Sequence, residues 1–123
     1  MPHVVIAALL SLALIGMAAA ETISGTASHY GCGDGFHGRR TASGGVFNAY
    51  GLSAAHRSLP FGTKLQVYLV DKRGNRKGAP VVVTVMDRGP FHGNRVLDLS
   101  CGAARALGMY EAGTAKVIGK VLR

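Results

Sequence analysis

A single aspartate follows the most strongly β-branched stretch of the chain. Residues 81–87 read Val-Val-Val-Thr-Val-Met-Asp, and Gly89-Pro90 comes shortly after. Val and Thr favour extended backbone, whereas a Gly-Pro pair ends a regular strand. Asp87 is therefore predicted where a rigid strand opens into a loop, a common place for catalytic side chains. The chain has only 6 Asp and Glu against 14 Lys and Arg, so few other carboxylates could do acid chemistry.

The elements that must hold Asp87 are predicted to be short strands joined by glycine-rich turns. Thr22–Tyr30 and Lys64–Val70 are predicted strands, and the second alternates apolar and polar side chains as a half-buried strand does. Asp71–Gly78 is polar and contains glycine, which indicates a hairpin tip before the strand that starts at Val81. Lys116–Leu122 is predicted to be a closing strand. Many short strands favour a small closed β-barrel, because closure leaves no exposed edge.

One helix and one long loop complete the predicted arrangement. Ser100 can cap a helix over Cys101–Leu107, and Gly108 can end it. Residues 31–45 include six glycines and are predicted to form a long irregular loop.

The first twenty residues have the pattern of a secretory signal peptide. An apolar run over Val4–Met17 is followed by three alanines that end at Ala20, and then by polar residues. The alternative is a retained anchor helix, although the run is near the short limit for spanning a bilayer. We expect residues 1–20 to be removed, leaving one domain over residues 21–123, exported to the periplasm or outside the cell. After removal of residues 1–20 we expect a soluble protein without stable membrane insertion. No cysteine lies near Ala20, so we do not expect a lipoprotein.

Export determines the expected redox state of Cys32 and Cys101, the two cysteines of the chain. Two cysteines in an oxidising compartment are expected to pair. Such a disulfide would close about 70 residues and stabilise the fold by roughly 4 kcal/mol in the chain-entropy model. The alternative is two free buried thiols. No Cys-x-x-Cys or His-x-x-x-His spacing is present, so the sequence predicts no metal site and no cofactor.

The formal net charge of +8 lies entirely after residue 20, since the first twenty residues contain no Asp, Glu, Lys or Arg. A basic exported domain is expected to bind anionic partners such as cell-wall polymers or a membrane surface. Export and the lack of an aromatic-rich recognition motif argue against nucleic acid as a partner. The charge does not predict an oligomeric state.

Four segments in order resemble the rare lipoprotein A (RlpA-like) family. They are residues 25–31 (Gly-Thr-Ala-Ser-His-Tyr-Gly), 36–44 (Phe-His-Gly-Arg-Arg-Thr-Ala-Ser-Gly), 54–63 (Ala-Ala-His-Arg-Ser-Leu-Pro-Phe-Gly-Thr), and 87–91 (Asp-Arg-Gly-Pro-Phe) followed by 95–100 (Arg-Val-Leu-Asp-Leu-Ser). The resemblance implies a mainly β fold, a six-stranded double-psi β-barrel with one or two short helices. It also implies a lytic transglycosylase that cleaves peptidoglycan glycan strands during cell-wall remodelling.

The resemblance assigns roles to five residues. Asp87 matches the family's catalytic acid, with a turn-capping aspartate as the alternative. His56 matches the site histidine, and Asn48 stands where Asp or Asn is usual. Tyr30 matches a family aromatic that could stack on a sugar or pack in the core. Arg88 either belongs to the site or projects away from it.

One position departs from the family pattern: Gly45 stands where a Glu is common. A lytic transglycosylase needs only one carboxyl group, because the sugar's own 6-hydroxyl attacks and the same group gives and takes the proton. Most glycoside hydrolases need two. Asp34 in the glycine-rich loop is a further carboxylate, either solvated or able to reach the site. A lost Glu leaves two other functions open, a catalytically reduced peptidoglycan-binding module or an expansin-like wall-loosening module.

Overall fold

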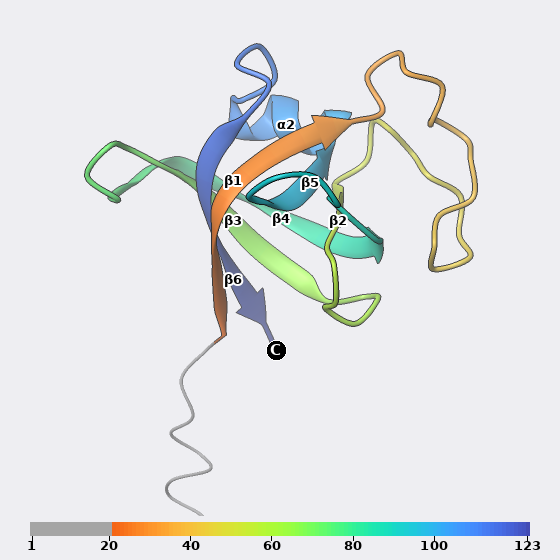
Figure 1. The fold of residues 1–123 in the computed structure, drawn as a ribbon, viewed down its shortest axis with the longest axis horizontal. Helices are drawn as coiled ribbons and strands as arrows, with labels where there is room; N and C mark the ends of the chain where they lie inside the picture. The colour runs from red at the N-terminus through yellow and green to blue at the C-terminus, as the bar shows by residue number, and fades with distance from the viewer. Residues whose placement is uncertain (1–20) are drawn as a thin grey trace, which may run out of the picture.

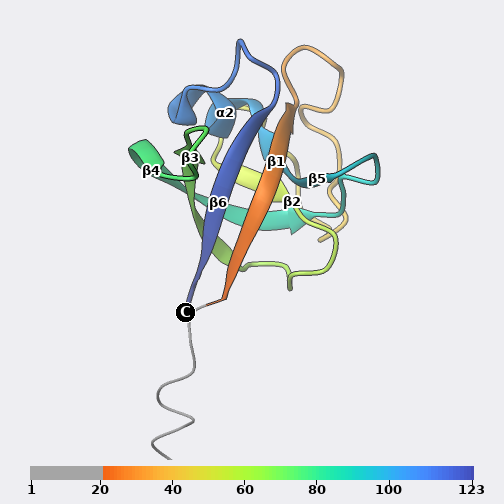
Figure 2. The same ribbon diagram turned by 60° about the vertical axis from the view of Figure 1, so that its left-hand side comes forward.

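The computed structural model describes residues 21–123, so the predicted signal peptide lies outside the described residues. These residues form six strands and one helix: β1 (Thr22–Tyr30), β2 (Ser53–Ala55), β3 (Lys64–Val70), β4 (Arg76–Asp87), β5 (Arg95–Ser100), α2 (Cys101–Leu107) and β6 (Ala115–Leu122). The strands close into a barrel in the order β1-β5-β2-β4-β3-β6 (Figures 1 and 2). The predicted mainly β, closed six-stranded barrel is confirmed.

Two parallel strand pairs distinguish this barrel from a simple meander. β1 pairs with β5 in parallel, and β2 pairs with β4 in parallel, while the other neighbours are antiparallel. The three-residue strand β2 lies between β4 and β5, so Ala55 pairs with Asp87 on one side and Asp98 on the other. The two aspartates therefore lie on the two strands that flank β2.

The barrel interior is filled by the inward-facing half of each strand. In β3, Leu65 and Val67 are buried while Lys64 is exposed, as the alternating pattern predicts. The largest fully buried apolar side chains come from four strands and the segment after the helix: Leu65, Leu97, Leu99, Met109, Val67, Val83, Val85 and Val117. Within residues 21–123, no helix has the length and apolar character needed to cross a membrane.

The predicted bounds of β1, β3 and α2 are confirmed, and the predicted closing strand starts one residue earlier than expected. The predicted hairpin tip over 71–78 is wrong in extent. β4 begins at Arg76, because Arg76 and Lys77 pair with Val70 and Leu69 and a bulge then absorbs the extra residues before Val81. Polar, glycine-bearing sequence therefore continues as strand beyond the turn.

The helix begins and ends at the predicted caps. The Ser100 Oγ accepts a hydrogen bond from the Ala103 N–H, and Gly108 adopts a left-handed conformation with φ 87°. Gly102, inside the helix, lies against the loop before β2. A Cβ at Gly102 would lie 2.5 Å from the Tyr50 carbonyl oxygen, so only glycine allows this close approach.

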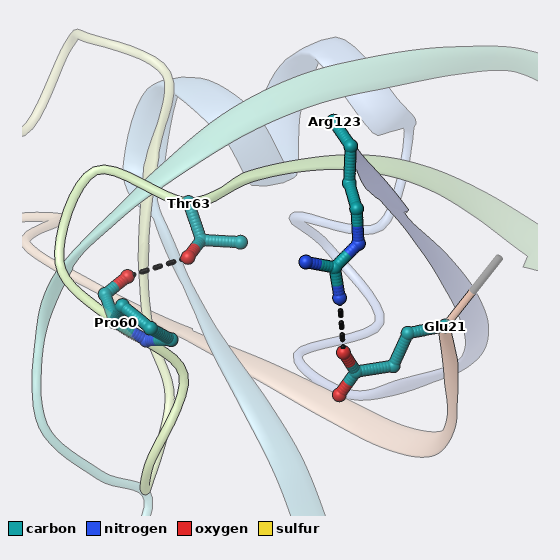
Figure 3. Close-up of polar contacts among 4 residues, drawn as sticks. All are labelled: Glu21, Pro60, Thr63 and Arg123. Carbon is teal, nitrogen blue, oxygen red and sulfur yellow. Dashed lines mark hydrogen bonds and ion pairs between the residues drawn. The ribbon is translucent and has the colours of Figure 1, made fainter. Parts of the chain in front are cut away.

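A salt bridge joins the two ends of the described chain, next to the paired strands β1 and β6. Arg123 Nη2 lies 2.9 Å from Glu21 Oε2, and the Thr63 hydroxyl nearby donates to the Pro60 carbonyl at 2.6 Å (Figure 3). The two charged side chains are 72% and 49% exposed. Because exposed ion pairs contribute little, Arg123→Ala is expected to lower the free energy of unfolding by less than about 1 kcal/mol. Urea denaturation checks this, and a larger loss would show that the pair holds β1 and β6 together.

Candidate active site

Asp87 lies at the end of β4, and its carboxylate is held by three donors. Oδ1 accepts hydrogen bonds from the backbone N–H groups of Ala42 and Arg88, each at 3.0 Å. Oδ2 accepts only one, a long bond of 3.4 Å from the Tyr30 hydroxyl. The side chain is half-buried. Oδ1 is thus occupied by two amides, and Oδ2 is the oxygen that is free to exchange a proton with a ligand.

The glycine-rich loop between β1 and β2 supplies one of these donors, and it is anchored at both ends. Cys32 and Cys101 form a disulfide with an S–S distance of 2.01 Å, as predicted. Phe47, Ala49 and Cys101 form a second small buried cluster beside the main core. Further along, the Ser43 N–H donates to the Met86 carbonyl, one residue before Asp87. The loop is therefore packed onto the end of β4 and holds the Ala42 amide in place.

The Tyr30 hydroxyl donates to Asp87, and its ring packs against two other aromatic side chains. Its ring stacks on Phe47 with centroids 4.6 Å apart, and the edge of Phe36 approaches at 5.9 Å. Burial first, and then the negative charge of Asp87, raise the pKa of the Tyr30 hydroxyl above its usual range. The hydroxyl consequently stays protonated and donates to Asp87. One ring face of Tyr30 is therefore packed against Phe47, as the core-packing alternative expects.

His56 contacts Asp87 through a backbone hydrogen bond, in which the His56 N–H donates to the Asp87 carbonyl at 3.1 Å. Its imidazole Nδ1 accepts from the N–H groups of Ser58 and Leu59 at 3.1 and 3.0 Å. Nδ1 must therefore be unprotonated, which places the proton of the neutral ring on Nε2. Burial first, and then the positive charge of Arg88, lower the pKa of His56. The ring is neutral near pH 7 and caps its own turn.

The lowered pKa of His56 makes a prediction about acid stability. The folded protein binds this proton less tightly than the unfolded chain, so the stabilisation is complete above about pH 6.5 and is lost as the pH falls towards the folded pKa. His56→Asn keeps an acceptor for the two amides but does not titrate. We expect its unfolding free energy to fall less steeply with decreasing pH below about 6.5 than that of the wild type. Parallel pH profiles would contradict the assignment.

The other two predicted site residues point their polar groups elsewhere. Arg88 donates through Nη1 to the carbonyls of His56 and Leu59, and its guanidinium lies 3.9 Å from the Phe61 ring centroid. Asn48 is exposed, and its Oδ1 accepts from the Tyr50 N–H. Both side chains shape loops that border Asp87, and neither contacts its carboxylate.

Asp34 is also engaged in its own turn. Its two carboxylate oxygens accept from the N–H groups of Gly31 and Phe36 at 2.7 and 3.1 Å. This arrangement matches an aspartate that stabilises a turn. Both oxygens of Asp34 are therefore engaged within the loop, while its negative charge also contributes to the raised pKa of Tyr30.

Asp98 is the carboxylate near the site that sequence reasoning missed. It lies on β5 opposite Ser28, whose hydroxyl donates to Asp98 Oδ1 at 2.8 Å. Burial raises the pKa of Asp98, and its charge also acts on Tyr30. Two strand spacings through Ala55 put the backbones of Asp87 and Asp98 roughly 10 Å apart. The sequence signal for it was an aspartate between two leucines, Leu97 and Leu99. No strand was predicted over this segment, so the side of the barrel that Asp98 faces was not predicted either.

Exposed aromatic side chains surround this region. Phe91 is 73% exposed and Tyr50 is 77% exposed, while Phe36 and Phe61 are 45% and 42% exposed. Phe36 touches Tyr30, Tyr50 belongs to the glycine-rich loop, and Phe91 follows the Gly89-Pro90 turn after Asp87. Aromatic faces at the rim of a site offer apolar surface against which a sugar ring can stack.

Comparisons with known proteins identify the family. A family model described as lytic transglycolase matches residues 22–118, from the first residue of β1 into β6. The chain belongs to this RlpA-like double-psi β-barrel family. A Nostoc protein named probable endolytic peptidoglycan transglycosylase RlpA is 54% identical over 82% of this chain. Endolytic peptidoglycan transglycosylase RlpA of Pseudomonas aeruginosa is 46% identical over 81%.

The similarity covers only part of each relative. The chain spans 26% of the Nostoc relative and 27% of the Pseudomonas relative. Among solved structures, an expansin of Clavibacter michiganensis has a TM-score of 0.63 and 27% identity, covering 84% of this chain and 51% of the expansin. A mutant of the same expansin was solved with cellohexaose. Streptomyces papain inhibitor, with a TM-score of 0.62 and 20% identity over 84% of this chain and 96% of its own, shares the fold.

Proposed function

We propose that this domain is an exported lytic transglycosylase that cleaves peptidoglycan glycan strands to 1,6-anhydro-muramyl ends. The observation that carries the proposal is the Asp87 carboxylate, fixed through Oδ1 by two backbone amides and open at Oδ2. The names of the relatives, which share about half of their aligned residues with this chain, support peptidoglycan as the substrate. The net charge of +8 suits an anionic wall.

The proposed reaction needs one group that gives and takes a proton, and this group is Asp87. Asp87, protonated on Oδ2, gives its proton to the glycosidic oxygen, and the bond between that oxygen and C1 of N-acetylmuramic acid breaks. The 6-hydroxyl of the same sugar then attacks C1 and returns its proton to Asp87, so no water is consumed. The Ala42 and Arg88 amides hold the carboxylate at one place through both steps. Tyr30 donates to Oδ2 whenever this oxygen is unprotonated.

Asp98 is a second carboxyl group near the site, with its backbone roughly 10 Å from that of Asp87. Its raised pKa suits a group that carries a proton at higher pH than an ordinary aspartate. We nevertheless assign the acid to Asp87, since Asp87 lies where β4 opens into a loop, whereas Asp98 is enclosed within β5. Separate Asn variants at the two positions distinguish the assignments.

A second candidate function is a glycan-binding module without catalysis. It is favoured by Gly45, because the family commonly has a Glu at this position and the glycine lacks that carboxylate. Gly45 lies in the turn that also presents the Ala42 amide to Asp87. The test is incubation with peptidoglycan stripped of stem peptides, followed by mass spectrometry. Anhydro-muramyl ends that accumulate with time support the enzyme. Sedimentation with the wall material and no anhydro ends, at high protein concentration, supports the binding module.

Gly45→Glu is expected to raise the rate of anhydro-end formation. Gly45 does not have a positive φ, and an added Cβ would lie 3.8 Å from the Thr41 Oγ1, so the turn accepts a side chain without strain. A Glu there adds one hydrogen-bonding carboxylate beside the substrate, and we expect an increase of about tenfold. Gly45→Gln is the matched control with the same length and no charge. Equal rates for both variants and the wild type would exclude position 45 from the site.

A further inference from the structure

A cavity of about 800 Å³ lies at the opposite end of the barrel from Asp87. It is bounded by the turn between β3 and β4, by the first residues of β4, by the end of α2, and by the start of β6. Asp87 is the last residue of β4 and Lys77 the second, so about 30 Å of strand separates the two places. The β3–β4 turn and the glycine-rich loop project from opposite sides in both views (Figures 1 and 2).

Part of the cavity lining is apolar. Leu69 and Val70 from β3, Met109 after the helix, and Ala112 and Ala115 before and in β6 contribute to its walls. The volume is within the range of sites that bind small molecules or short peptides. A ligand seated here would therefore bury apolar groups of its own.

The rim of the cavity is positively charged. Lys72, Lys77 and Lys116 come from three separate segments, and within residues 21–123 none of them forms a salt bridge. The one carboxylate in the lining, Asp71, is engaged in its turn through Oδ1, which accepts from the Arg73 and Asn75 amides at 2.9 Å. The three ammonium groups remain available for carboxylates of a ligand.

We propose that this cavity binds a short acidic peptide in which carboxylate and apolar side chains are interspersed. Three lysines line the cavity and can pair with several carboxylates along one chain, whereas a fatty acid brings a single carboxylate. The apolar part of the lining matches apolar side chains, which a sugar phosphate polymer lacks. This peptide site is separate from the carboxylates at the other end of the barrel and operates independently of them.

The test measures the fluorescence anisotropy of a labelled Glu-Leu-Glu-Leu-Glu peptide titrated with the protein. We expect saturable 1:1 binding that weakens with added salt. The double variant Lys72→Gln/Lys116→Gln should weaken the affinity about tenfold, since two ion pairs are lost. Lys64→Gln/Lys120→Gln is the matched control, because these exposed lysines lie on the same barrel outside the cavity. The control should bind as the wild type does.

Two further variants test whether the peptide occupies this cavity. Ala112→Trp fills the cavity without changing the charge, and should abolish binding, whereas Asp87→Asn should leave it intact. No saturable binding, equal binding of a Gln-Leu-Gln-Leu-Gln peptide, or equal losses in the two lysine pairs would overturn the site. Binding of phosphatidylglycerol vesicles through Lys72 and Lys116, without peptide binding, would also overturn it and identify a lipid surface.

Discussion

Asp87→Asn is expected to lower the rate of anhydro-muramyl end formation by about 10²- to 10⁴-fold, which is the usual contribution of a general acid–base group. Asn keeps the shape of the side chain, and its Oδ1 can still accept from the Ala42 and Arg88 amides. It cannot give or take a proton at the second position. The loss should therefore appear in the rate at saturating glycan, while sedimentation with the wall material stays close to that of the wild type.

Asp98→Asn is the matched control for this result. It removes a half-buried carboxyl group from β5, on the other side of β2 from Asp87, and keeps an acceptor for the Ser28 hydroxyl. We expect it to retain a substantial part of the activity. If Asp98→Asn abolishes activity and Asp87→Asn does not, the acid is Asp98, and Asp87 is the group that orients it.

The second large effect concerns the disulfide between Cys32 and Cys101. The bond joins residues separated by 69 positions. Its removal in Cys32→Ala/Cys101→Ala is expected to lower the free energy of unfolding by about 4 kcal/mol in the chain-entropy model. The same change releases the glycine-rich loop from the helix, so activity should fall together with stability as the Ala42 amide leaves Asp87. Guanidinium denaturation and the glycan assay measure the two losses.

Reduced wild-type protein controls for the cavity that the alanine at the buried position 101 creates. Reduction breaks the link but keeps both sulfur atoms in place. Equal destabilisation of the reduced protein and the double variant would assign the loss to the link. A double variant within about 1 kcal/mol of the oxidised wild type would show that the packing of Phe47 and Ala49 alone holds the loop.

Much of the fold could be predicted because local signals and tertiary structure agree. The alternation in Lys64–Val70 and the caps at Ser100 and Gly108 specify their elements without help from distant residues. β2 could not be found in this way. It has three residues, all buried, and exists because β4 and β5 pair with it on both sides.

The site was predictable in part for the same reason. Asp87 stands out locally, at the end of a β-branched run that meets a Gly-Pro turn. The roles of Tyr30 and Asp98 depend on the parallel pairing of β1 with β5, which no short stretch of sequence reveals. Arg88 is a residue for which the local sequence was misleading. Its place next to Asp87 suggested a site residue, but strand geometry directs its guanidinium to the carbonyls of the His56 turn.

The most direct test of the central claim is cleavage of stripped glycan strands in water enriched in oxygen-18. The proposed reaction closes the muramic acid ring with its own 6-hydroxyl and a single proton carrier, so water is not a reactant. The account predicts product ends that lack one water relative to hydrolysed ends and carry no oxygen-18. Reducing ends labelled with oxygen-18 would contradict it, because they would show that the carboxylates around Asp87 activate water.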